Sequence, residues 1–209
     1  MDSLYTLTDL AESFTQSIGG DAEQQKRIHR QLRNVLTQRL LTPTDTRGGR
    51  RDALFNNREA AKARIQIAII DAGLDAVTLQ AVSDYWDRAV DPRLGLPPIN
   101  GNFPPYALDA VLSDAVRADV PEWAFVIKVR RDIETGERKV IAAFVRADQP
   151  EPPEHEPISG KGPHADNVEV HEGRFGDNGD VVWARIAPRL TIATITIPAT
   201  ALIRPLLSE

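Results

Sequence analysis

Five prolines within a short stretch constrain the fold of this chain more than any other feature of its sequence. They lie between Asp91 and Pro105. Because proline has no amide hydrogen and a fixed φ angle, no helix continues through this stretch. Apolar residues before it recur at helical spacing, whereas several segments after it alternate as strands do. The pattern predicts a helical domain over residues 1–90, a stiff proline-rich linker over 91–106 and a second domain over 107–209.

The second domain is expected to contain antiparallel β-strands, so the fold class is α+β. A short helix is predicted over residues 107–116, a hairpin over 122–145, strands over 181–187 and 189–197, and a helical turn over 199–207. A change of phase between Ile192 and Ile195 predicts a β-bulge. The polar stretch at about 147–167 has too little apolar surface to offset its ordering entropy, so we expect a flexible loop there. With 42% hydrophobic residues among 209, the chain can bury a core.

The net charge of −5 conceals a strongly basic segment. From Lys26 to Arg64 there are 11 basic and 3 acidic residues, a net charge of +8, so the rest of the chain is strongly acidic. A charge arranged in this way indicates a local negatively charged partner more reliably than the total does.

Two helices are predicted before and within this basic segment. The first begins near Thr8 as its N-cap, and the second runs from an Asp21 N-cap to about Leu41. On a helical wheel the second helix has one apolar side and an opposite basic side. The apolar side carries Ile28, Leu32, Val35 and Leu36, and the basic side carries Lys26, Arg30, Arg33 and Thr37. Such a face can simply be solvated, but cations repel one another at this spacing and no acidic residue lies between Lys26 and Thr44.

A glycine pair surrounded by arginines follows the basic helix. Residues 40–55 are interpreted as a helix end, a strand, a tight turn at Gly48–Gly49 and a returning strand, with Arg47, Arg50 and Arg51 beside the turn. A basic hairpin next to a basic helix meets the physical requirement of a winged helix, in which the helix enters the major groove and the wing contacts the DNA alongside it. Arginine suits both positions because its guanidinium group is permanently charged and forked.

The order of these segments over residues 4–87 resembles the DNA-binding domain of MerR-type winged-helix regulators. The matching phrases are Thr6 to Ala11, Leu40 to Pro43, Arg47 to Arg51 and Ala72 to Leu79. The resemblance implies a winged helix-turn-helix fold and a transcriptional regulator that binds double-stranded DNA. Three features depart from the family. The segment from Asp21 to Leu41 is longer than its recognition helix, the usual dimerising helix is interrupted by prolines, and no cysteine is present to sense a metal ion.

This interpretation assigns ten residues to DNA binding. They are Gln24, Gln25, Lys26, Arg27, Arg30, Arg33 and Asn34 on the helix, and Arg47, Arg50 and Arg51 on the wing. The two glutamines are predicted to read base edges, since a side-chain amide can form paired hydrogen bonds with adenine. Lys62 and Arg64 are further candidates for phosphate contacts, although such residues more often solvate a helix end.

A single winged helix contacts few base pairs, so we expect a homodimer or a protein partner through the C-terminal part, where exposed strand edges could pair. Two alternatives to a regulator remain open. One is an architectural or recombination accessory protein, such as a phage excisionase, which bends DNA. The other is an interaction module whose basic stripe docks on an acidic protein surface.

Other functional classes receive little support from the sequence. His155, His164 and His171 lie among carboxylates, but their spacing fits neither a helical nor a strand ligand pair, so we expect no metal and no cofactor. The segment around Ser159–Gly160 lacks the context of a phosphate loop or a nucleophile elbow, and no enzymatic activity is expected. The first residues lack the order of a secretory signal and no apolar run reaches membrane-spanning length, so a cytoplasmic location is predicted.

Overall fold

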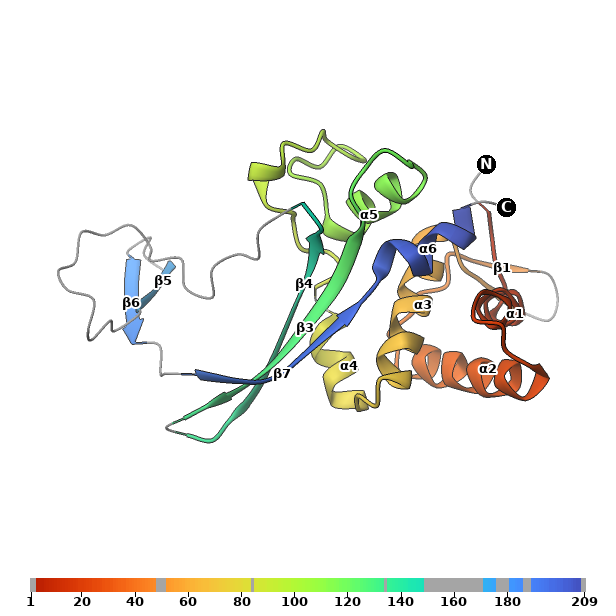
Figure 1. Ribbon diagram of the computed structural model, residues 1–209, viewed down its shortest axis with the longest axis horizontal. Helices are drawn as coiled ribbons and strands as arrows, with labels where there is room; N and C mark the ends of the chain where they lie inside the picture. Colours follow the sequence, from red (N-terminus) through yellow and green to blue (C-terminus); the bar gives the residue numbers. More distant parts are fainter. Residues whose placement is uncertain are drawn as a thin grey trace.

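The computed structural model describes residues 3–47, 52–83, 85–133, 135–148, 171–175, 181–185 and 189–207 (Figure 1). Its helices are α1 (Leu7–Ser17), α2 (Ala22–Thr37), α3 (Asn57–Asp71), α4 (Ala76–Ser83), α5 (Ala107–Ala115) and α6 (Ala199–Leu207), with a 3₁₀ helix at Pro92–Leu94. Its strands are β1 (Asp45–Arg47), β2 (Asp52–Leu54), β3 (Trp123–Asp132), β4 (Arg138–Arg146), β5 (His171–Phe175), β6 (Val181–Arg185) and β7 (Arg189–Ile197). This mixture of helices and antiparallel strands confirms the α+β class.

Both N-terminal helices begin with reciprocal side-chain caps. Thr6, not Thr8, is the N-cap of α1, because its hydroxyl accepts the Asp9 N–H while the Asp9 carboxylate accepts the Thr6 N–H. Asp21 caps α2 as predicted. That helix ends at Thr37, earlier than the expected Leu41, and Arg39 then adopts a positive φ of 59° that turns the chain away from the helix axis.

A short hairpin follows α2 and is joined to the N-terminal segment. β1 and β2 pair antiparallel, with Asp45 opposite Leu54 and Arg47 opposite Asp52, which confirms the two predicted strands. The glycine turn between them lies outside the described residues. Tyr5 and Phe55 exchange two backbone hydrogen bonds of 2.9 Å. The N-terminal segment therefore continues the hairpin as a third, very short strand partner.

The main sheet has the order β4-β3-β7, with antiparallel neighbours throughout. The hairpin that the sequence predicted is formed by β3 and β4, which pair Trp123 with Arg146 at one end and Arg131 with Arg138 at the other. In β7 the pairing with β3 shifts between Val129 and Arg130, which leaves Ile192 without a residue opposite it. This confirms the predicted bulge. The last segment forms a nine-residue helix, α6, rather than a single helical turn.

One hydrophobic cluster runs from Tyr5 to Leu206 and includes residues on both sides of the proline-rich stretch. Trp86, which precedes the prolines, stacks on Phe125 of β3 with ring centroids 4.8 Å apart. The proline-rich stretch returns on itself, because the Val90 N–H donates to the Pro105 carbonyl. Helix α6 comes back to α1 and α3, and the Tyr5 hydroxyl donates to the Leu206 carbonyl at 2.8 Å. The described residues thus share one continuous core. The division of the chain into separate units at 1–90, 91–106 and 107–209 stays a prediction.

Candidate nucleic-acid interface

Helix α2 separates its apolar and basic residues onto opposite sides. Ile28, Leu32 and Val35 are buried against the neighbouring helices, with exposed fractions of 0–1%. The side chains at the opposite positions are exposed to solvent; they include Lys26, Arg30, Arg33 and Thr37. The helical wheel therefore predicted correctly which face of α2 reaches the surface.

The cations of this exposed face differ in how they are partnered. Lys26 pairs with Glu23 at 2.8 Å, but both side chains are largely exposed, and such a pair stabilises the fold very little. Arg27 lies 3.5 Å from Asp71 at the end of α3. Arg30 and Arg33 form no ion pair or side-chain hydrogen bond with any residue that the structure describes. Two guanidinium groups one helical turn apart are thus available to an anion.

The amide side chains predicted to read bases occupy different positions. Gln24 is half-buried, and its Oε1 accepts the Asp21 N–H at 3.3 Å as part of the cap of α2. It therefore has a structural role that base reading would interrupt. Gln25 is also half-buried, whereas Asn34 is exposed beside the basic face. Asn34 and Arg30 are consequently better placed to meet a base edge than Gln24.

The hairpin that follows α2 in the sequence is held firmly at its base. The Thr44 N–H donates to the Leu54 carbonyl at 2.7 Å, and the Thr44 hydroxyl accepts the Asn56 N–H at 3.1 Å. Arg47 closes β1 opposite Asp52, although its side chain is not described. Arg50 and Arg51 lie outside the described residues, so their assignment to a wing stays a prediction.

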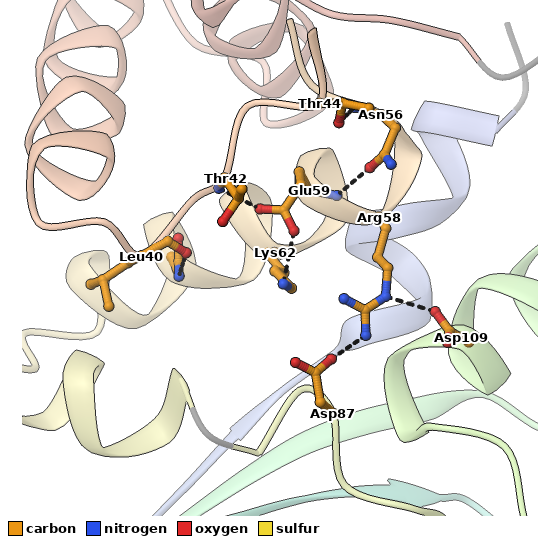
Figure 2. Close-up of polar contacts among 10 residues, drawn as sticks. Leu40, Thr42, Thr44, Asn56, Arg58, Glu59, Lys62, Asp87 and Asp109 are labelled. Atoms are coloured by element: carbon orange, nitrogen blue, oxygen red, sulfur yellow. Dashed lines mark hydrogen bonds and ion pairs between the residues drawn. The ribbon is translucent and has the colours of Figure 1, made fainter. Parts of the chain in front are cut away.

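Polar side chains of α3 fix the chain where it leaves α2, as Figure 2 shows. The Glu59 carboxylate accepts the Thr42 N–H at 2.8 Å and pairs with Lys62 at 2.8 Å. Two turns after Glu59, Gln66 Nε2 donates to the Leu40 carbonyl at 3.1 Å. These bonds fix the course of the chain between the end of α2 and the start of the hairpin. Glu59 and Gln66 therefore position the hairpin relative to α2. The sequence reasoning did not identify them.

Lys62 and Arg64 of α3 are not part of the exposed surface, which corrects the expectation that they contact phosphate. Arg64 is 1% exposed and donates to the Leu202 carbonyl at 2.8 Å and to the Ser13 hydroxyl at 2.6 Å. Lys62 has a side chain only 11% exposed and pairs with Glu59. The sequence-derived charge of +8 therefore overstates the charge that a partner of this region can meet.

Arg58 joins the start of α3 to the region around the proline-rich stretch (Figure 2). Its Nε donates to Asp109 of α5 at 2.8 Å, and its NH2 group pairs closely with Asp87. Burial by itself lowers the pKa of this guanidinium, but the hydrogen bonds to Asp87 and Asp109 raise it above its usual value on balance. Arg58 thus remains charged and links the start of α3 to α5 and to the segment that follows α4.

Other kinds of site find no support in the described part of the chain. No three acidic or histidine side chains gather there as metal ligands do. His155 and His164 lie outside the described residues, and the side chain of His171 is not described. None of the described helices is long and apolar enough to cross a bilayer.

No protein-family model matches the chain, and comparisons with curated proteins and with solved structures gave no significant match.

Proposed function

We propose that the protein is a sequence-specific regulator that binds double-stranded DNA, with α2 as the recognition helix and the β1–β2 hairpin as the wing. The observation that carries this proposal is the pair Arg30 and Arg33, exposed and without a described partner, on a helix whose opposite side is fully buried. A rigid helix that presents unpaired guanidinium groups can enter a major groove and contact both phosphates and guanine edges.

The order and pairing of the elements support a winged helix. Two capped helices, α1 and α2, are followed by a hairpin and then by α3, and the N-terminal Tyr5 pairs with Phe55 beside the hairpin. This is the sequence of parts that the resemblance to MerR-type regulators implies. The winged-helix assignment remains part of the proposal.

The polar contacts of α3 support a fixed relation between the two DNA-binding parts. Glu59 and Gln66 hold the segment between α2 and the hairpin, and Thr44 closes the base of the hairpin. A preorganised surface loses less conformational entropy when it binds than a mobile one does. The arrangement therefore favours a specific duplex geometry over loose attraction to any polyanion.

Binding is measured best by fluorescence anisotropy on duplexes selected from a random pool with the full chain. With about five phosphates neutralised, log K should fall with log salt at a slope of roughly −4 to −5. Arg30→Ala together with Arg33→Ala should reduce the magnitude of the slope by about 2 and lower the affinity about tenfold or more at about 0.15 M salt. A slope near zero for the unmodified chain contradicts DNA binding.

A matched control removes two exposed cations from other parts of the molecule. Arg117 follows α5 and Lys139 lies on β4, and both are exposed. Arg117→Ala together with Lys139→Ala changes the net charge equally and should leave the affinity within about twofold, because the removed groups do not contact a duplex on α2. An equal loss in both double variants means that net charge, rather than the α2 face, governs binding.

The hairpin and the helix are expected to contribute differently. Arg50→Ala together with Arg51→Ala should weaken binding to all sequences alike, since a wing contacts mainly phosphate, whereas Arg30→Gln should change the preferred sequence. An architectural protein would use the same contacts but bend its site strongly. Circular permutation of the selected site measures that bend and distinguishes the two roles.

A further inference from the structure

The two edges of the main sheet are protected to different degrees. The β4 edge begins with Arg138 and Lys139 and ends with Arg146. Arg138 is also held by α4, because its guanidinium donates to the Thr78 hydroxyl at 3.2 Å and lies 3.6 Å from the Asp75 carboxylate. Charged residues and a covering helix are standard means of preventing an edge strand from pairing with another chain.

The β7 edge is less protected, because Arg189 at its start is the one charged residue of the strand, although α3 contacts the strand. From Leu190 to Ile197 the strand contains no charged residue and no proline, and β3 is its one neighbour among the described strands. Leu190 and Ile192 are 58% and 48% exposed. They lie at the end of the sheet that extends beyond the helices in Figure 1, near Ile133, which is 64% exposed. A long, uncharged and apolar edge of this kind is suited to strand addition.

The sequence of this strand is complementary to itself. Ile195 and Ile197 face the helices in register with Ile127 and Phe125, whereas Thr194 and Thr196 lie on the other face and are exposed. In an antiparallel pair centred on Ile195, Thr194 meets the partner's Thr196 and Ala193 meets the partner's Ile197. Threonine therefore meets threonine on one face, aliphatic residues meet on the other, and no two charges are brought together.

We propose that the protein forms a homodimer in which the β7 strands of two copies pair antiparallel about a twofold axis at Ile195, so that the two three-stranded sheets become one. The bulge at Ile192 limits the regular pairing to residues 193–197, and the exposed Leu190 and Ile192 extend the apolar contact at each end. Ala193, which is exposed although it lies on the helix side of the sheet, becomes covered by the partner's Ile197. The dimer does not depend on DNA binding.

Sedimentation velocity on the full chain tests this assembly. We expect a dimer at about 50 μM protein and a monomer when Thr194→Lys and Thr196→Lys are combined, because the pairing then opposes lysine to lysine twice. Both threonines are exposed, so the monomer should keep the circular dichroism spectrum of the unmodified chain, and its melting temperature should equal that of the unmodified chain at dilutions where the latter is monomeric. The dissociation constant should rise at least tenfold. The control, Ala143→Lys with Ala147→Lys, adds the same charge at exposed positions at and beyond β4 and should leave the dimer intact.

A cross-link provides a readout that does not require a disruptive variant. The chain has no cysteine, so Ile195→Cys introduces a single thiol located on the proposed axis. Directly opposed residues in an antiparallel pair have Cα atoms about 4.5–5.5 Å apart, which a disulfide can span. Mild oxidation should give a covalent dimer from Ile195→Cys and none from Ala147→Cys. A monomer at 50 μM, a dimer that survives the paired lysines, or a dimer lost in the β4 control overturns the proposal.

Discussion

Helices α2 and α3 are neighbours in sequence and both are rich in basic residues, yet their cations have opposite surroundings. On α2, Arg30 and Arg33 extend into solvent without a described partner. On α3, Arg64 is buried and Arg58 is held by two aspartates. The difference shows that a run of basic residues in a sequence measures the charge of a segment, not the charge of the surface that a partner meets.

The cause lies in how many sides of each helix are covered. α2 contacts α1 and α3 along one side and leaves its other side to solvent. α3 is contacted by α1, α2, α4, α5 and α6, and it buries residues all around its axis. A helix that is covered on every side has no polar face. Its charged side chains must therefore find hydrogen-bond acceptors inside the protein, as Arg64 does with a carbonyl of α6.

The largest expected effect follows the removal of Arg64. Arg64→Ala leaves the Leu202 carbonyl and the Ser13 hydroxyl without this donor and opens a void beside Phe14, whose ring lies 5.7 Å from the guanidinium. We expect the free energy of unfolding to fall by about 3 kcal/mol in urea denaturation. Arg64→Met keeps most of the volume and should lose less. A loss below about 1 kcal/mol for the alanine variant means that α6 does not depend on this contact.

A smaller effect is expected at Arg58, which is partly exposed. Its side chain is 27% exposed and bridges Asp87 and Asp109, so water can replace part of what is lost. Arg58→Ala should lower the free energy of unfolding by about 1–2 kcal/mol, because the carboxylate of Asp109 is then left nearly buried and unpaired. Arg117→Ala, which breaks an exposed pair with Asp119, serves as the control and should not change it. If Arg58→Ala and Arg117→Ala lower the free energy of unfolding equally, Arg58 stabilises the fold no more than an exposed arginine does.

The features that the sequence predicted are those governed by local chemistry. The Asp21 cap, the two strands around the glycine pair and the exposed side of α2 each depend on residues within a few positions of one another. The roles of the α3 side chains depend on distant neighbours. Asn56 caps α3, and Glu59 three residues later has the spacing of a capping box, but its carboxylate bonds Thr42 instead. Arg64 contacts a carbonyl 138 residues away, which no local pattern indicates.

The smallest expected effect on stability, close to zero, belongs to the α2 face itself. Arg30→Ala together with Arg33→Ala removes two exposed cations that lie three residues apart and repel each other, so the free energy of unfolding should stay within about 0.5 kcal/mol or rise slightly. The same double variant is expected to lose DNA affinity. Unchanged unfolding with weakened binding assigns these arginines to a partner rather than to the fold. A destabilisation comparable to that of Arg64→Ala places them instead in the same structural class as the cations of α3.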